Sequence, residues 1–221
     1  IFDENYKVQQ YQLGFRGNLS DAWSYDVFGS YDKTEHTLTN RFAVLKSQVQ
    51  RLLNAADGGR SLCAGGFNPF GDANARSLSA ECQAFITTNA VNKEDLTQTQ
   101  FQAQINGELF DLGAGPAQLA LLGSYRKNTY AFAPDINFTA ASGFAPGGNV
   151  ESVVNTLPLS KKGISVKEIA AQIDIPLLSE KPFFQELSVG AAGRYSDYST
   201  VGTTKTYQAD ARWRPVNELL F

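Results

Sequence analysis

The stretch QTQFQAQINGEL at residues 98–109 decides the fold of this chain. From Gln98 to Asn106 every even position carries an amide side chain, whereas Phe101, Ala103 and Ile105 occupy odd positions. A period of two places successive side chains on opposite faces of a β-strand. The stretch therefore predicts a strand with one amide face and one apolar face.

The same alternation recurs along the chain, for example where Gln10 and Gln12 alternate with Tyr11 and Leu13. It predicts seven strands, at residues 6–19, 23–38, 96–112, 117–132, 163–178, 186–198 and 204–215. Residues 219–221 follow a turn and look like the start of an eighth strand. Apolar residues at helical spacing between positions 42 and 53 predict one short helix.

Short and long connections alternate between these predicted strands. The short turns lie near Ser20, Gly115, Lys181 and Asn217, the long excursions cover residues 39–94 and 133–162, and the connection near Val201 is modest. Transmembrane β-barrels have short turns on one side, longer loops on the other, and strands of about 9–11 residues. Ordinary globular strands are shorter, at about 5–6 residues.

We therefore expect an all-β fold, an antiparallel transmembrane β-barrel segment whose apolar face meets lipid and whose amide face lines a lumen. A soluble sandwich, with the apolar face against a protein core, is the alternative. Backbone groups cannot stay unpaired in hydrocarbon, and seven crossings leave two edges. We accordingly expect these seven to eight strands to form an arc of a larger wall.

Composition narrows the class of protein. The 221 residues carry a formal net charge of -3, so no basic excess points to nucleic acid. No apolar run reaches the length of a membrane helix, and a mean hydropathy of -0.25 suits a barrel, in which only alternate residues must be apolar. Because methionine is absent and no signal peptide is visible, we expect a fragment or a processed piece.

The two cysteines, Cys63 and Cys82, lie close together in a polar, glycine-rich stretch. This placement predicts a local disulfide, formed in an oxidising compartment and worth about 3 kcal/mol in the chain-entropy model. Two free thiols are the alternative. No metal site is expected, because the single histidine, His36, is distant and no CxxC spacing exists.

No catalytic residue and no cofactor are expected, so the sequence does not predict an enzyme. The chain has no Gly-x-Ser-x-Gly elbow, no Walker loop and no HExxH motif. Asp26 and Asp32 share a strand face, but they are better explained as solvated lumen residues.

Ligand contact is the better hypothesis for the polar face. The arginines that fall in register with that face are Arg16, Arg126, Arg194, Arg212 and Arg214. They could meet an anionic metal chelate or a polyol. The more ordinary arrangement pairs them with carboxylates such as Asp26, Glu108 or Asp210.

Aromatic residues supply a second set of candidates. Phe67, Phe70 and Phe144 lie in the long excursions, where they could stack on a ligand or pack the loop onto itself. Trp23 and Trp213 are expected at the membrane interface on the side of the short turns, where amphipathic rings settle.

Three stretches carry a resemblance to a known family. CAGGFNPFG at 63–71 with LSAEC at 78–82 resembles a cysteine-bounded extracellular loop, ELSV at 186–189 with RYSDYS at 194–199 resembles a strand and hairpin, and WRP at 213–215 resembles the next turn. Together they resemble the barrel region of TonB-dependent outer-membrane receptors. The family often has Asn-Pro-Lys after the hairpin, where this chain has TTKT at 203–206.

The resemblance implies that residues 1–221 are part of a barrel domain of about 22 strands, with the plug domain outside these residues. It implies a receptor in the outer membrane of a Gram-negative bacterium that imports a scarce nutrient, an iron–siderophore or similar chelate, or an oligosaccharide. The implied partners are outer-membrane lipid, the nutrient, and TonB with its inner-membrane complex acting through the plug. A passive porin-like barrel and a soluble all-β carbohydrate-binding or structural domain are the alternatives.

Overall fold

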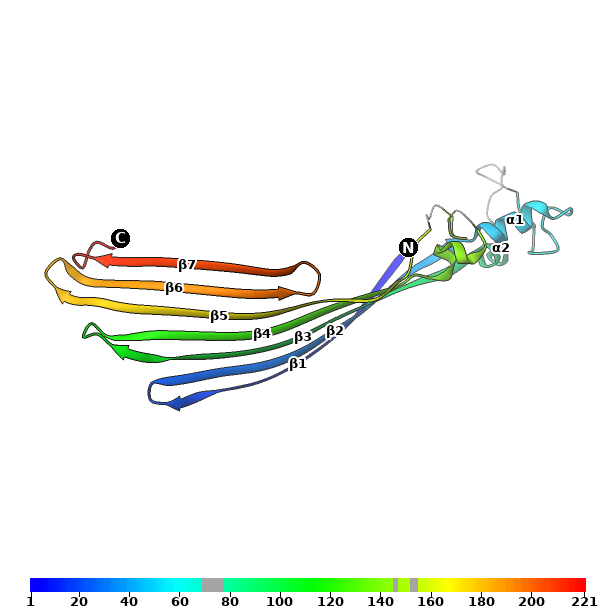
Figure 1. The fold of residues 1–221 in the computed structure, drawn as a ribbon. Coiled ribbons are helices and arrows are strands. Elements are labelled where there is room, and N and C mark those ends of the chain that lie inside the picture. The colour runs from blue at the N-terminus through cyan, green and yellow to red at the C-terminus, as the bar shows by residue number, and fades with distance from the viewer. Residues whose placement is uncertain (69–77, 145–146, 152–154) are drawn as a thin grey trace. The chain divides into compact units, whose positions relative to one another are not determined.

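The computed structural model describes residues 1–68, 78–144, 147–151 and 155–221. Within them the strands form one sheet in chain order, from β1 to β7 (Figure 1). Their bounds are β1 Phe2–Ser20, β2 Trp23–Val44, β3 Thr87–Asp111, β4 Pro116–Ala133, β5 Leu159–Lys181, β6 Phe184–Tyr198 and β7 Gly202–Arg214. The sheet is antiparallel and is not closed, which confirms the expected all-β barrel segment.

The long connections are shorter than predicted, because the strands run further. Residues 39–44 continue β2 and residues 87–94 begin β3. The Arg41 N–H donates to the Ile1 carbonyl at 2.9 Å, and the Phe42 N–H donates to Asn89 Oδ1 at 3.4 Å. The prediction that the helix starts at position 42 is therefore wrong, because residues 42–44 belong to β2. The spacing of apolar residues does not show which backbone groups are hydrogen-bonded by other strands.

The predicted helix exists, but it is α1, Lys46–Asn54. A second helix, α2, Ala80–Ile86, was not predicted. Its first turn is capped by Ser79, whose side chain accepts a hydrogen bond from the Cys82 N–H. Two short 3₁₀ turns, η1 Ile136–Phe138 and η2 Ala140–Ser142, lie in the second long connection.

The strand register confirms the period of two. Ile169 of β5 faces Tyr195 of β6, which faces Lys205 of β7, and the next row on the same face includes Gly193 opposite Tyr207. Ala170, Arg194 and Thr206 form the intervening row on the other face, and Glu168, Ser196 and Thr204 form the next row of that face toward the loop end. Odd positions of these strands therefore share one face, and even positions share the other.

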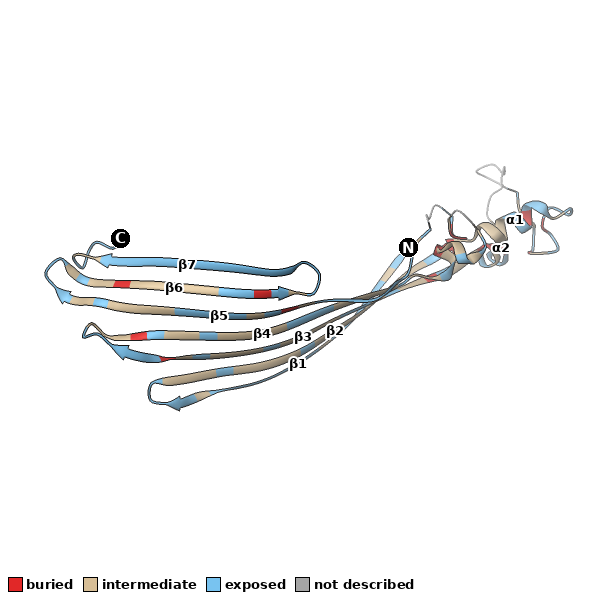
Figure 2. Ribbon diagram, viewed as in Figure 1, coloured by how far each residue is buried: buried red, intermediate tan, exposed pale blue. Residues whose placement is uncertain are grey.

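Among the described residues, no second layer covers the apolar face. The exposed fractions of Leu13, Ile169 and Tyr207 are 68%, 65% and 80%, and Figure 2 shows few buried residues along the strands. A sandwich needs a second sheet against this face. Within the part of the chain that the structure describes, all strands belong to the one sheet, so the sandwich alternative lacks its second layer.

Contacts divide the chain into two compact units, which we describe separately. The loop unit comprises residues 1–8, 34–96 and 130–162, and the band unit comprises residues 9–33, 97–129 and 163–221. The loop unit contains the helices, and the band unit contains the short turns between strands.

Each strand of the band unit carries a run whose odd positions are all apolar or glycine. These runs are 11–19, 23–31, 101–109, 117–125, 169–177, 187–195 and the shorter 207–213. A nine-residue run has the length with which a tilted strand crosses the hydrocarbon core, about 9–11 residues. We call these odd positions the apolar band.

Trp213 contacts several residues at the turn end of the apolar band, where the short turns join the strands. Its indole N–H donates to the Phe183 carbonyl at 2.9 Å, and its ring lies 6.0 Å from Phe184 and 5.6 Å from Phe221. Trp213 and Phe221 also exchange two backbone hydrogen bonds, of 3.0 and 2.8 Å. This reciprocal pair is the antiparallel pairing expected where an eighth strand begins.

Gly107 leaves room for Trp23 within the apolar band. A Cβ built on Gly107 would overlap the Trp23 ring, whereas nothing lies within 4 Å of a Cβ built on Gly123. In the full receptor, Gly107→Val should lower the free energy of unfolding in detergent by about 1–3 kcal/mol, the usual cost of overpacking. Urea unfolding followed by tryptophan fluorescence measures this, and Gly123→Val is the matched control. Equal stability of the two variants would contradict the expectation.

Candidate functional site

Glu168 is the centre of one polar cluster on the even face of the band unit. Its carboxylate accepts hydrogen bonds from Ser196 Oγ at 2.8 Å and from Ser124 Oγ at 3.4 Å. Arg194 Nη1 lies 4.0 Å from Glu168 Oε1. Because a carboxylate has two oxygens and several lone pairs, Glu168 connects β4, β5 and β6 across this face.

Glu186 is the centre of a second cluster, near the turn end. Arg212 Nη1 lies 3.4 Å from Glu186 Oε1, and Arg214 Nη2 lies 3.7 Å from Oε2. Within the described ranges, the carboxylate partner of Arg212 and Arg214 is Glu186, and Asp26, Glu108 and Asp210 do not take this place. The register explains the difference, because Glu186 stands directly opposite Arg214, whereas Asp210 stands opposite Gly190 and its carboxylate occupies the space above that glycine.

Arg16 and Arg126 differ from the other candidate arginines. Within the described ranges, no carboxylate lies within ion-pair distance of either guanidinium. Both lie at even positions, Arg16 on β1 and Arg126 on β4, so they belong to the amide face. A guanidinium without a carboxylate partner keeps its donors available for an anionic or hydroxyl-rich ligand.

The amides on this face pair with one another. Gln98 Nε2 donates to Asn128 Oδ1 at 2.9 Å, and Gln104 Nε2 donates to Asn106 Oδ1 at 2.8 Å. A surface of amides and hydroxyls offers donors and acceptors without a fixed charge, which suits contact with water or polar solutes.

A disulfide forms the core of the first long connection. Cys63 and Cys82 are joined, with their Cα atoms 5.0 Å apart, and both are buried. Leu52 of α1 and Ile86 of α2 are buried in the same cluster, and Phe67 packs against it. The cluster therefore holds the two helices and part of residues 55–68 around one cross-link.

Asn149 ties the second long connection to the first. Its Oδ1 accepts the Ser47 N–H at 2.8 Å, and its carbonyl accepts the Lys46 N–H at 2.7 Å. These are first-turn donors of α1, whose own N-cap residue, Leu45, provides no side-chain hydrogen bond. The Asn149 side chain is buried and also donates to Asn137 Oδ1 at 3.3 Å.

The aromatic candidates occupy different places. Phe67 is partly buried against the disulfide cluster. Phe144 lies under the Lys46 ammonium, 5.9 Å from its ring centre, beside a cavity of about 380 Å³ that Val49 and Leu53 also line. Phe70 lies outside the described residues.

Sequence reasoning missed a cluster around His36 in the loop unit. The His36 ring stacks on Tyr6 at 4.2 Å, and its Nδ1 lies 3.2 Å from Glu94 Oε2. Glu4 Oε2 accepts the Tyr6 hydroxyl at 3.2 Å and lies 4.0 Å from His36 Nε2. Only the strand register, which brings residues 58 positions apart into contact, could have revealed it.

Desolvation, together with nearby carboxylates, raises the pKa of Tyr6 and Tyr130. Desolvation is the largest cause of the raised pKa of Tyr6, followed by the negative charge and hydrogen bond of Glu4. Desolvation, then the charge of Glu94, likewise raises the pKa of Tyr130. Both phenols therefore stay protonated and can act as hydrogen-bond donors at neutral pH.

Two searches for other features gave negative results over the described ranges. No group of three or more His, Cys, Asp and Glu side chains is placed to hold a metal ion. No helix has the length and apolarity needed to cross a membrane.

An open antiparallel sheet with an apolar band on one face and a polar face behind it defines a segment of a transmembrane β-barrel. The chain matches the family described as TonB dependent receptor-like, beta-barrel, over residues 2–221. The chain therefore belongs to the TonB-dependent receptor β-barrel family, whose members are outer-membrane receptors and transporters of Gram-negative bacteria. No curated protein matches it.

Removal of the disulfide should loosen the loop unit. In the full receptor, the double substitution Cys63→Ala and Cys82→Ala should lower the local stability of α1 and α2 by about 3 kcal/mol, the chain-entropy value for a loop of this size. Hydrogen exchange of peptides from α1 and α2 measures it. Peptides from residues 97–129 serve as the internal control, and unchanged protection of the helices would refute the prediction.

Asp57 gives the same connection a dependence on pH. The hydrogen bond from the Ser61 side chain is the largest cause of the lowered pKa of Asp57, and the hydrogen bond from the Ser61 backbone adds to it. Partial desolvation acts in the opposite direction. Its Oδ2 accepts the Ser61 N–H at 2.7 Å, and its Oδ1 accepts the Gly59 N–H at 3.0 Å. A lowered folded-state pKa contributes stability above the unfolded value, and that contribution is lost as pH falls.

We expect the segment between α1 and Cys63 to lose protection as pH falls below about 4, the ordinary range of a free aspartate. Hydrogen exchange corrected for its intrinsic pH dependence provides the measurement. Asp57→Asn should lose this pH-dependent step while keeping the disulfide, and an identical pH profile in the variant would rule out Asp57 as its source.

Proposed function

We propose that this protein takes up a scarce nutrient across the outer membrane of a Gram-negative bacterium, with energy supplied by TonB. The family match over residues 2–221 is the observation that carries the proposal. In this proposal, TonB and its inner-membrane complex act through a plug domain outside the 221 residues, inside a barrel of about 22 strands. The substrate is bound and passed through a gate, without chemical change.

The polar face supports binding of an anionic or hydroxyl-rich solute. Arg16 and Arg126 have guanidinium groups without carboxylate partners in the described ranges, whereas Arg194 and Arg212 face Glu168 and Glu186. The first two are therefore the stronger ligand-contact candidates. An iron–siderophore or similar chelate would use their charge, and an oligosaccharide would use the amides beside them.

Growth on defined nutrients tests the proposal. A strain lacking the full receptor should fail to grow when the correct siderophore chelate or oligosaccharide is the only source of iron or carbon. Plasmid-borne receptor should restore growth, and deletion of TonB should abolish the rescue. Rescue that persists without TonB would instead indicate a passive porin-like barrel.

Arg126→Gln should weaken binding of the identified nutrient about tenfold, because hydrogen bonds to a charged group are worth about 1.5–3 kcal/mol. Arg212→Gln is the matched control, since Arg212 already lies 3.4 Å from Glu186 and Arg214 remains there to pair with it. Equilibrium binding to the purified receptor is the readout. If Arg212→Gln weakens binding more than Arg126→Gln, the assignment of contacts is reversed.

A further inference from the structure

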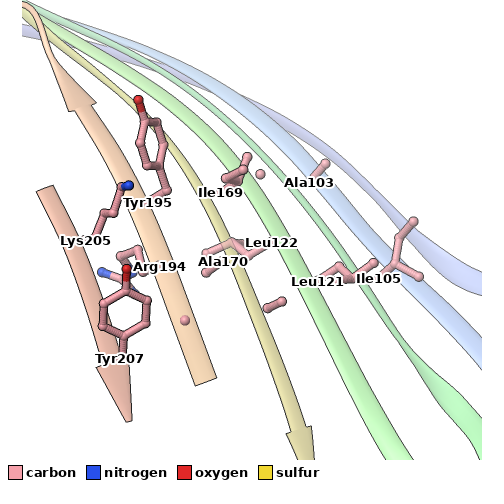
Figure 3. Close-up of a pocket in the computed structure, with 13 residues that line it drawn as sticks. Ala103, Ile105, Leu121, Leu122, Ile169, Ala170, Arg194, Tyr195, Lys205 and Tyr207 are labelled. Atoms are coloured by element: carbon pink, nitrogen blue, oxygen red, sulfur yellow. The ribbon is translucent and has the colours of Figure 1, made fainter. Parts of the chain in front are cut away.

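A groove runs across the apolar band on strands β3 to β7. It has a volume of about 720 Å³ and is lined by Ala103, Ile105, Gly123, Ile169, Gly193 and Tyr207, among others. Figure 3 shows Tyr195, Lys205 and Tyr207 along one side, with Ile105 and Leu121 toward the other. We call this hollow the band groove. Its depth comes from small residues, because Gly123 and Gly193 have no side chain to fill it.

The band groove continues toward the loop end of the strands, by which we mean the end that leads to the long connections. A second hollow, of about 480 Å³, shares Ala103, Gly123, Ile169 and Tyr195 with it and extends to Lys167. Lys205 lines the first hollow, and Lys167 lines the second. Both lysines are exposed. Lys205 stands in the Ile169–Tyr195–Lys205 row of the register, and Lys167 stands opposite Asp197 in the adjacent row of the same face. An apolar channel therefore leads to two ammonium groups.

These lysines belong to a set of seven positions, one on each strand, that borders the apolar band. We call this set the row of lysines. The odd positions immediately beyond the band at the loop end are Gln9, Lys33, Thr99, Lys127, Lys167, Asp197 and Lys205. Four of the seven are lysines, and Asp197 is the single acid. The turns at the other end, with the strand residues that directly adjoin them, carry the acids Asp21, Asp111, Glu180 and Glu218 against Lys181 and Arg214. The basic excess is thus confined to the edge of the band at the loop end.

We propose that the band groove binds one anionic, phosphate-bearing membrane lipid, with an acyl chain along the groove and the phosphate at Lys205 and Lys167. The apolar lining matches an acyl chain, and the lysines match a phosphate that lies where hydrocarbon gives way to headgroups. Asp197, opposite Lys167 in the register, offsets part of this charge, so Lys205 is the main contact. This lipid site rests on placement of the barrel in a membrane and is independent of the imported nutrient.

Native mass spectrometry of the purified full receptor tests the site directly. The receptor is released from mixed micelles that contain equal amounts of phosphatidylglycerol and phosphatidylcholine with identical acyl chains. We expect retained phosphatidylglycerol in excess over phosphatidylcholine. The double variant Lys167→Gln and Lys205→Gln should lower its retention about fivefold for each lysine removed. The control Lys161→Gln and Lys162→Gln removes two lysines of β5 that lie beyond the row, and should leave retention unchanged.

Filling the band groove gives a second, charge-independent test. Gly123→Leu adds a side chain where nothing lies within 4 Å of the Cβ, so it should displace the acyl chain without strain in the sheet. Gly29→Leu is the control, because Gly29 lies in the apolar band on β2, away from the groove, and a Cβ there meets only the Gln100 carbonyl at 3.7 Å. Retention should fall with Gly123→Leu alone.

Three results would overturn the proposal. Equal retention of the two lipids would remove the role of the lysines. Displacement of lipid by inorganic phosphate, with Gly123→Leu behaving as the native receptor, would indicate a free-anion site. A receptor dimer that Gly123→Leu dissociates would assign the groove to a second copy of the chain. Nutrient uptake, measured on the same variants, reports the proposed transport separately.

Discussion

The structure depends on one constraint: every backbone N–H and C=O group in hydrocarbon must have a hydrogen-bond partner. Each unpaired N–H or C=O group in lipid costs several kcal/mol, so every strand needs a neighbour on both sides across the apolar band. Strands β2 to β6 obtain theirs within the chain. The reciprocal hydrogen bonds of Trp213 and Phe221 extend this pairing beyond β7. The side chains then decide which solvent each face of the sheet meets.

The loop unit follows a different physical rule. Its helices are too short to be stable alone, since isolated helices need about 12–15 residues even in favourable sequences. Burial of Leu52, Cys63, Cys82 and Ile86 in one cluster, with the disulfide at its centre, supplies the tertiary support. The polar His36 cluster lies on strands of the same unit, where the carboxylates of Glu4 and Glu94 contact aromatic and imidazole rings.

The period of two made the strands, their faces and the short turns predictable from sequence, because the pattern of Gln98 to Asn106 reports the two solvents directly. Strand ends were harder to predict. Residues 39–44 and 87–94 lie beyond the apolar band. Their apolar residues are consecutive, as in Phe42, Ala43 and Val44, so alternation no longer marks a strand. The partners of the arginines could not be predicted, since they depend on register across strands, as Glu186 and Arg214 illustrate. The row of lysines was present in the sequence, but only the bounds of the apolar band reveal it.

The hydrogen bonds that Asn149 accepts from the first turn of α1 make the two long connections one folding unit. A helix whose first-turn donors are satisfied by another segment cannot be exchanged by itself. Transplanting the first connection into a related receptor would therefore leave Lys46 and Ser47 without acceptors unless the second connection moved with it. Over evolutionary time, the two connections should diversify together, as a pair inherited jointly.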